Sequence, residues 1–281
     1  MMKTFILIFQ CKDQKGIVAK VSELIFKCNG NIVALDQYST HLKAGRLFMR
    51  IEFMAEEKDL IKDKLDRQIK SIARYFKAGF KLYDKGRMLR MGVLVSKPDH
   101  CLADILYLQK RGELSVEIPF VISNFLGHRE MVEQYKIPFY FIPAAKKNRK
   151  EDEILRHALQ STDFLALARY MLVLSPKFIK TYGKDIINIH HGLLPSFKGA
   201  NPYQQALDAG VKEIGATAHF VTAKPDVGPI IAQAVEQVSH KDDLKSLLLK
   251  GMSLEKRALN DALHAYIEHR VIRFKDKTVI F

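Results

Sequence analysis

Short apolar runs of the strand type alternate with segments of helical spacing along residues 91–190. In chain order these runs cover 91–95, 116–123, 129–135, 139–142, 151–160, 164–167, 176–182 and 186–190. Such alternation is typical of a parallel sheet with helices on both faces. Two further strands are predicted at 210–222 and 229–238, and a long closing helix at 241–268. The larger part of the chain is therefore predicted to be an α/β domain.

A different pattern precedes this domain. Strand-like runs at 5–10, 32–40, 46–54 and 80–82 are separated by helix-like segments at 18–27 and 58–76. Within 46–54 the odd-numbered apolar residues are predicted to share one face and the even-numbered residues the other. The order β-α-β-β-α-β is the ferredoxin-like order. A basic link at 85–87 predicts a boundary there, with domains 1–85 and 86–281.

Composition indicates an ordinary globular protein, with 48% hydrophobic and 27% charged residues in a chain of 281. The apolar run near the N-terminus is too short for a spanning helix or a secretory signal, so we expect a cytoplasmic protein without a membrane partner. Cys11, Cys28 and Cys101 lack CxxC spacing, which predicts free thiols.

The formal net charge of +14 raises the question of a polyanionic partner. The densest basic cluster, residues 146–150, lies between a strand-like and a helix-like segment, where a solvated loop is expected. Because no stacking aromatic residues accompany it, we expect no nucleic acid partner.

Four polar residues near the end of the α/β pattern have the chemistry of an acyl-transfer site. Asn188 offers a carboxamide donor, His190 and His219 offer imidazoles, and Asp226 offers a carboxylate. Such groups stabilise an oxyanion and move protons at a carbonyl carbon. Asn188 and His190 end a predicted strand, where the reactive residues of open α/β sheets lie. An enzyme is the leading hypothesis.

Each of these residues also has a structural interpretation. Asn188 alone is typical of an amide at a strand end, and His219 of a buried interior imidazole. His191 is as consistent with the core as with the site. A metal site made of His190, His191 and His219 is conceivable, but adjacent histidines on a strand point to opposite faces and no HExxH or CxxC motif is present. We therefore expect no metal.

The chain resembles the folate-dependent formyltransferase superfamily, whose pattern is Asn-x-His at a strand end, a second His in a later strand and an Asp seven residues after it. Asn188, His190, His219 and Asp226 occupy these positions. The likeness extends through residues 194–199 and 215–222. The resemblance implies a Rossmann-like, mostly parallel formyltransferase domain.

Within that superfamily the chain looks most like the formyltetrahydrofolate deformylases. These have an N-terminal ACT domain, which matches residues 1–85, a His-His pair where His190 and His191 stand, and a segment similar to 96–102. Glycinamide ribonucleotide formyltransferases carry a glycine- and serine-rich phosphate loop at that last position. Pro98 lacks an amide hydrogen and Asp99 repels anions, so segment 96–101 is a poor phosphate cradle.

The deformylase resemblance implies hydrolysis of 10-formyltetrahydrofolate to formate and tetrahydrofolate, which supplies formate for purine biosynthesis and balances the one-carbon folate pool. Asn188 and protonated His190 are expected to face the formyl oxygen, Asp226 to position and deprotonate water, and His219 to shuttle a proton or orient a neighbour. The resemblance also implies a folate pocket lined by Arg169, Tyr170, Met171, Leu174 and Gly199.

The same resemblance implies no cofactor beyond the folate substrate. ACT domains pair and bind small amino acids, so a homo-oligomer with glycine or methionine as effector is expected. Two alternatives remain open from the sequence. One is a phosphoribosylglycinamide-type formyltransferase, and the other is a non-catalytic binding protein that senses folate or an amino acid.

Overall fold

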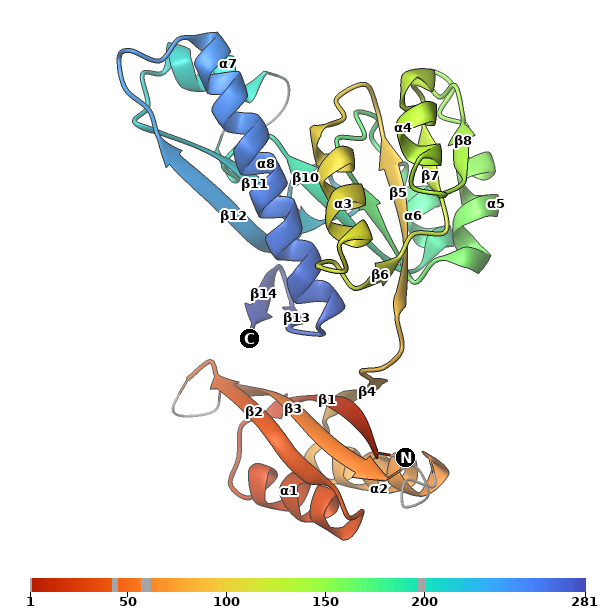
Figure 1. The fold of residues 1–281 in the computed structure, drawn as a ribbon. Coiled ribbons are helices and arrows are strands. Elements are labelled where there is room, and N and C mark those ends of the chain that lie inside the picture. Colours follow the sequence, from red (N-terminus) through yellow and green to blue (C-terminus); the bar gives the residue numbers. More distant parts are fainter. Residues whose placement is uncertain (1, 42–44, 57–61, 197–200) are drawn as a thin grey trace. The chain divides into compact units, whose positions relative to one another are not determined.

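The computed structural model describes residues 2–41, 45–56, 62–196 and 201–281 (Figure 1). The chain forms two compact units. The first comprises Met1–Met88 with Glu268–Ile272 and Phe281, and the second comprises Leu89–Ile267 with Arg273–Ile280. Residues from the end of the chain thus belong to the first unit, which the linear division at residue 85 did not anticipate.

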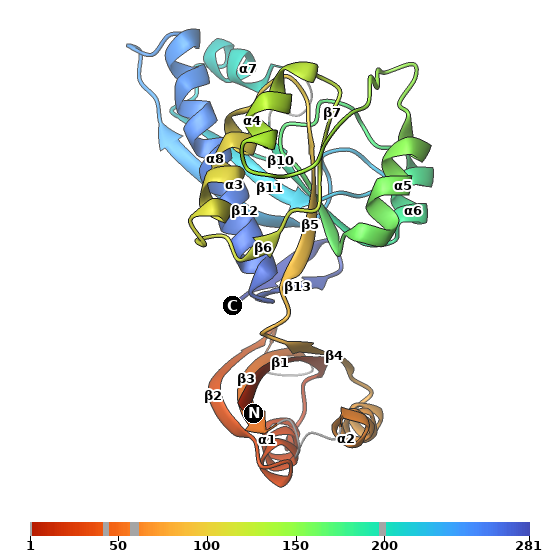
Figure 2. The same ribbon diagram turned by 45° about the vertical axis from the view of Figure 1, so that its right-hand side comes forward.

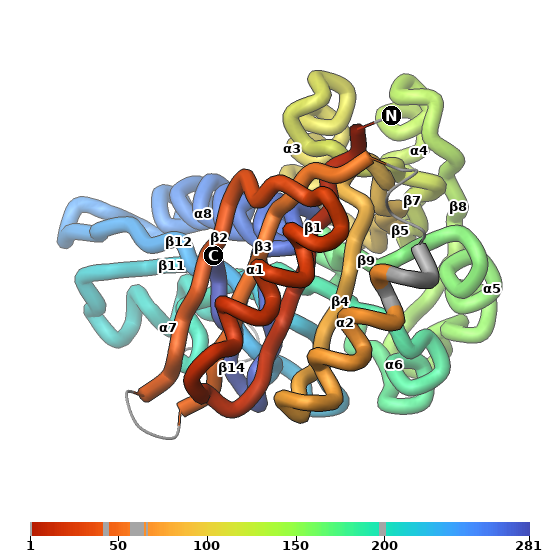
Figure 3. The backbone as a smooth tube through the Cα atoms, turned by 90° about the horizontal axis from the view of Figure 1, so that it is seen from below, coloured from red at the N-terminus to blue at the C-terminus, as the bar shows by residue number. Residues whose placement is uncertain are grey.

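The first unit has the predicted βαββαβ order, and its sheet has the strand order β2-β3-β1-β4 with antiparallel neighbours. Figure 2 shows α1 and α2 on the same side of this sheet, and Figure 3 views the unit from its helix side. The elements are β1 (Met2–Lys12), α1 (Ile17–Lys27), β2 (Asn31–Ser39), β3 (Arg46–Glu56), α2 (Lys62–Phe76) and β4 (Gly79–Asp84).

Strand β3 has the predicted alternation of faces, and residues on both faces are buried. Its odd-numbered apolar residues join the core under α1 and α2, as expected. Phe48 and Arg50 on the other face are buried as well. The Arg50 guanidinium donates a hydrogen bond to the backbone carbonyl of Glu268 at 3.1 Å and contacts the Glu52 carboxylate at 3.3 Å. The second face is therefore occupied by a segment more than 200 residues away in the sequence.

The second unit is an α/β domain around one sheet with the strand order β12-β11-β10-β9-β5-β7-β8, and β6 pairs with β5. Helices α3 and α7 were not predicted, and neither was the final hairpin of β13 and β14, of which residues 273–280 belong to this unit. The elements are β5 (Leu89–Val95), α3 (His100–Lys110), β6 (Val116–Glu117), β7 (Val121–Ser123), η1 (Leu126–His128), α4 (Arg129–Glu133), β8 (Phe139–Phe141), α5 (Glu151–Ser161), β9 (Phe164–Leu167), α6 (Pro176–Tyr182), β10 (Asp185–His190), α7 (Pro202–Asp208), β11 (Glu213–Phe220), β12 (Ile230–Gln237), α8 (Leu244–Ile267), β13 (Val271–Phe274) and β14 (Lys277–Ile280).

The sheet is mostly parallel, as predicted. The run β10-β9-β5-β7-β8 is parallel throughout, whereas β11 runs antiparallel beside β10 and β12 pairs antiparallel with β11 at the edge of the sheet. After β5 the chain adds β7 and β8 on one side and then β9 and β10 on the other. The strand order therefore reverses at β5, and ligands of open α/β sheets bind outside the carboxyl ends of the strands at such a point.

Helices cover both faces of this sheet. Residues of α5 and α6 share an apolar cluster with Leu94, Leu165 and Ile186 from three neighbouring strands. Helix α8 contacts β10, β11 and β12, and it also contacts α3 (Figure 1). None of the helices in the described part of the chain has the length and apolar character needed to span a bilayer.

Leu94 tests how strongly the central strand depends on this packing. We expect Leu94→Ala to lower the free energy of unfolding by about 2–5 kcal/mol, because a fully buried side chain leaves a cavity. Leu249→Ala, at a leucine of α8 that is 60% exposed, is the matched control and should change it by less than about 0.5 kcal/mol. Urea unfolding followed by circular dichroism measures both, and equal losses would contradict the assignment of Leu94 to the core.

Candidate active site

Strands β10 and β11 bring two of the predicted site residues together. β10 ends at His190, as expected, and its antiparallel pairing with β11 sets Asn188 opposite His219 and His190 opposite Thr217. Side chains of directly paired residues lie on the same face of a sheet. The register alone therefore makes the carboxamide and the second imidazole neighbours.

The beginning of β10 is held by the end of the chain. The Tyr266 hydroxyl donates to the Asp185 carboxylate at 2.9 Å, and the Arg273 guanidinium pairs with the same carboxylate. Arg273 also lies 3.7 Å from the ring centre of Phe220, the last residue of β11. These contacts fix the two strands that carry the site.

Asp226 reaches the site from the loop that joins β11 to β12. It has a left-handed backbone conformation, with φ of 53°. Two residues later, Gly228 lies so close to the Phe220 carbonyl oxygen that a Cβ atom would overlap with it. The loop is held across its neck, where the Phe220 amide donates to the Pro229 carbonyl at 2.9 Å. A close backbone approach therefore requires glycine at position 228.

Asp226 and His190 form the central contact of the site. The Asp226 Oδ1 atom lies 3.3 Å from Nδ1 of His190, whose side chain is buried. The hydrogen bond from His190 outweighs the effect of burial and lowers the pKa of Asp226. The Nε2 atom of His190 is buried and has no hydrogen-bond partner among the described residues. A buried nitrogen of this kind is a natural contact for a polar atom of a ligand.

His219 is oriented by the backbone. Its Nδ1 atom lies 3.0 Å from the Phe220 carbonyl oxygen, which accepts the proton and leaves Nε2 as the acceptor of the neutral ring. The Asn188 Nδ2 atom lies 3.2 Å from that Nε2 and can donate to it. Burial lowers the pKa of His219 and so favours the neutral ring. Its distance of 3.8 Å from Asp226 is too long for a hydrogen bond. The geometry therefore fits an orienting role toward Asn188.

His191 lies beside the group without joining its hydrogen bonds in the described structure. Its ring centre is 5.4 Å from that of His190 and 6.2 Å from that of Tyr203. Burial, with a contribution from the positive charge of Arg169, lowers its pKa to about 4. The ring is therefore neutral near pH 7.

Two residues that the motif did not single out hold the turn after the histidines. The Thr217 hydroxyl donates to the Gly192 carbonyl at 2.8 Å and accepts from the Leu194 amide at 3.0 Å. The Gln233 amide donates to the Leu194 carbonyl at 2.9 Å and to the Thr217 hydroxyl at 3.0 Å. Thr217 pairs directly with His190 and therefore lies on the same face of the sheet. A prediction of the register between the two strands would have identified it.

The predicted folate segment follows β9 at the same edge of the sheet. Ser96, just after β5, donates its amide to the Arg169 carbonyl at 3.2 Å and accepts from the Met171 amide at 3.0 Å. Met171 is 49% exposed, whereas Tyr170 and Leu174 are buried in the apolar cluster beneath the sheet edge. Gly199, the remaining predicted folate contact, lies outside the described residues.

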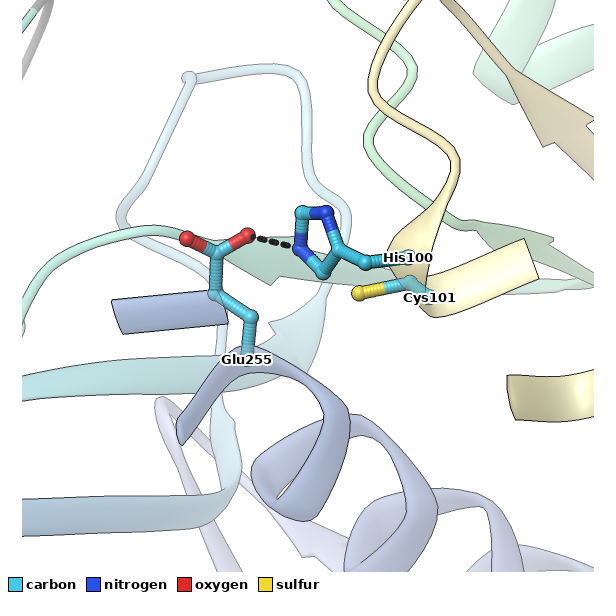
Figure 4. Close-up of side chains that lie close together, drawn as sticks. All are labelled: His100, Cys101 and Glu255. Carbon is cyan, nitrogen blue, oxygen red and sulfur yellow. Dashed lines mark hydrogen bonds and ion pairs between the residues drawn. The ribbon is translucent and has the colours of Figure 1, made fainter. Parts of the chain in front are cut away.

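A close group of possible metal ligands lies elsewhere in the unit. Ligand atoms of His100, Cys101 and Glu255 lie within 4.8 Å of one another (Figure 4). However, Arg169 Nε is 3.1 Å from the Glu255 oxygen that contacts His100. Burial, followed by the charge of Glu255, raises the pKa of Cys101 well above its usual range, so the thiol stays protonated. A guanidinium and a neutral thiol fit a divalent cation poorly.

Residues 89–263 match the family described as formyl transferase, and residues 5–69 match the ACT domain. A protein from Arabidopsis thaliana named formyltetrahydrofolate deformylase 1, mitochondrial, is 42% identical over 98% of this chain and 87% of its own length. The chain belongs to the formyltetrahydrofolate deformylase family.

Solved structures agree with membership of the deformylase family. The crystal structure of a formyltetrahydrofolate deformylase from Pseudomonas syringae has a TM-score of 0.92 at 38% identity, and the match covers 100% of this chain and 95% of that one. A glycinamide ribonucleotide transformylase from Symbiobacterium toebii has a TM-score of 0.64 at 30% identity, covering 72% of this chain and 98% of that one. The match to the transformylase thus leaves more than a quarter of this chain without an equivalent.

Gly228 offers a test of the loop geometry in this deformylase-family site. We expect Gly228→Ala to lower kcat/KM roughly 100-fold, because the loop and the carbonyl that holds His219 must move apart, and shifts near 1 Å are enough for such losses. Gly79→Ala in β4 is the control, since its Cβ would make an ordinary contact at 3.6 Å. Steady-state assays of both variants are the measurement, and full activity in Gly228→Ala would show that the loop tolerates the displacement.

Proposed function

We propose that this chain hydrolyses 10-formyltetrahydrofolate to formate and tetrahydrofolate by attack of water on the formyl carbon. Its place in the deformylase family supplies the substrate class. The observation that carries the proposal is the contact between Asp226 and His190, which leaves the buried Nε2 atom of His190 to face a ligand. A binding-only pocket has no need for this arrangement of acid, imidazole and amide.

The formyl oxygen gains negative charge as water adds to the carbon. In the proposed reaction this oxygen lies between the Nε2 proton of His190 and the second amide hydrogen of Asn188. The other amide hydrogen points to His219, which fixes the carboxamide before substrate arrives. Donors arranged in advance around developing charge usually provide the largest catalytic contribution.

The attacking water is assigned to Asp226. The side chain of Asp226 is 26% exposed, so solvent reaches it, and its Oδ1 atom lies 3.3 Å from Nδ1 of His190. Water forms a C–O bond to the formyl carbon, the C–N bond breaks and the departing nitrogen takes a proton. Because a carboxylate with a lowered pKa is a weak base, we assign the proton transfer to the Asp226–His190 pair rather than to Asp226 alone.

Hydrolysis is favoured over transfer to an amine by the contacts of Ser96. Its amide and hydroxyl bind the segment after β9, and its carbonyl accepts from His128 Nε2 at 2.8 Å. These groups are already engaged within the protein. Pro98 and Asp99, which follow, are poor partners for a phosphate. These contacts support the proposal that this segment does not bind the phosphate of an amine acceptor.

The match to the ACT family supports proposals for the first unit. We propose that it binds a small amino acid, with glycine and methionine as the candidates, and that it mediates a homo-oligomer. A supply of formate for purine biosynthesis, a cytoplasmic location and independence of any cofactor beyond the folate substrate stay predictions of the same proposal.

Release of formate is the decisive test. Purified protein mixed with 10-formyltetrahydrofolate alone should release one formate for each tetrahydrofolate formed, measured with a coupled formate assay. Adding glycine or methionine tests the proposed effectors in the same reaction. Formate that appears only when an amine acceptor is supplied, or not at all, would reject the hydrolase.

Asp226→Asn tests the role of the carboxylate in the same assay. We expect kcat to fall by about 10²–10⁴-fold, the range typical of losing a group that handles protons. Tetrahydrofolate binding, measured by calorimetry, should remain detectable because the amide keeps the shape of the side chain. Retained hydrolysis would remove the role assigned to the carboxylate.

The pH dependence follows from two lowered pKa values. Asp226 has a lowered pKa, so it keeps its charge as the pH falls until the pH approaches that value. His219 also has a lowered pKa and stays neutral below the ordinary histidine value of about 6.5. We therefore expect the acid limb of kcat/KM to lie below that value. A limb at or above it, in protein that circular dichroism shows to be folded, would contradict the neutral ring.

A further inference from the structure

Glu255 of α8 is a charged residue buried inside the second unit, with 1% of its surface exposed. His100 Nε2 lies 2.8 Å from its Oε2 atom, and the Tyr203 hydroxyl donates to its Oε1 atom at 3.0 Å. Arg169 Nε lies 3.1 Å from Oε2. Three segments far apart in the sequence therefore meet at one carboxylate.

The contacts keep Glu255 ionised. Burial opposes the charge, but the hydrogen bond from His100 and the positive charge of Arg169 prevail and lower the pKa of Glu255. Removing a carboxylate from water costs several kcal/mol unless its partners hold a well-defined geometry. His100 and Tyr203 meet this requirement through hydrogen bonds to the carboxylate, whereas Arg169 contributes an ion pair whose Nε atom makes no hydrogen bond among the described residues.

Each partner belongs to or follows a different segment near the candidate active site. His100 begins α3 immediately after the segment from Ser96 to Asp99. Arg169 begins the segment that follows β9. Tyr203 lies in the first turn of α7, shortly after the motif at 194–199, and its ring packs so closely on Gly251 that a Cβ atom there would overlap with it. The first two segments are joined at the carboxyl ends of β5 and β9, where Ser96 is hydrogen-bonded to the backbone of Arg169 and Met171.

Arg169 adopts a backbone conformation that needs such support. Its φ of 64° is in the left-handed region, which costs a non-glycine residue of order 1–3 kcal/mol. Such a conformation is kept only where several surrounding contacts hold it. Its backbone is held by Ser96 and its side chain by Glu255. Loss of either restraint would allow the segment to relax.

We propose that Glu255 is a positioning residue for the folate pocket, which it shapes through His100, Arg169 and Tyr203 without touching the substrate. The proposal rests on the folate-hydrolase function proposed above. It assigns the carboxylate a role in substrate affinity rather than in the chemical step, because the Asp226–His190 contact does not involve it.

Glu255→Gln tests this role, since the amide keeps the size of the side chain and removes the charge that faces Arg169. We expect KM for 10-formyltetrahydrofolate to rise about tenfold or more while kcat changes less than about threefold, the pattern of lost binding that is equal in ground and transition states. Asp261→Asn is the matched control on the same helix, at a side chain that is 58% exposed. It should leave both constants unchanged.

A second readout does not depend on turnover. Hydrogen exchange followed by mass spectrometry should become faster at 96–102 and 169–174 in Glu255→Gln and stay unchanged in Asp261→Asn. If the wild-type protein releases no formate, the hydrolase proposal fails while this measurement still judges the role of Glu255. Should Glu255→Gln not fold, Tyr203→Phe removes one contact, and we then expect about a threefold rise in KM. Unchanged KM and unchanged exchange, or a loss confined to kcat, would overturn the proposal.

Discussion

The antiparallel return of β11 beside β10 is the constraint on which the site depends. Parallel strands bring the segments after β5, β9 and β10 to one edge of the sheet, but they do not by themselves add a second imidazole. The return strand sets His219 opposite Asn188 and then delivers Asp226 through the following loop. One pairing register thus brings together a carboxamide, a carboxylate in contact with an imidazole, and a second imidazole, from residues spread over the chain between 188 and 226.

The fold followed from the sequence wherever a local pattern determined the element. Apolar periodicity located both helices of the first unit, the parallel strands and α8. It missed β13 and β14, which are short and have no repeating pattern of their own. It placed Arg50 on the face opposite the apolar residues of β3 but could not show what covers that face, because the Glu268 carbonyl that accepts from Arg50 lies 218 residues away in the sequence.

The site could be proposed from the sequence because Asn188, His190, His219 and Asp226 form a spaced motif. The contacts of the supporting residues could not be predicted from the sequence, because their partners are backbone groups or distant side chains. Thr217 binds the Gly192 carbonyl through a register that spacing does not reveal. Glu255 occupies an ordinary position of an amphipathic helix, and its burial depends on His100, which lies 155 residues earlier.

The membership of Glu268–Ile272 and Phe281 in the first unit has a consequence for how the chain can be divided. A fragment cut at residue 85 would lose the carbonyl that receives the Arg50 guanidinium and the His269 ring stacked 3.7 Å from that of Tyr83. The amino-terminal module is therefore not self-sufficient. The first unit gains these contacts only once residues 268–272 have been synthesised, and therefore not before most of the second unit has been made.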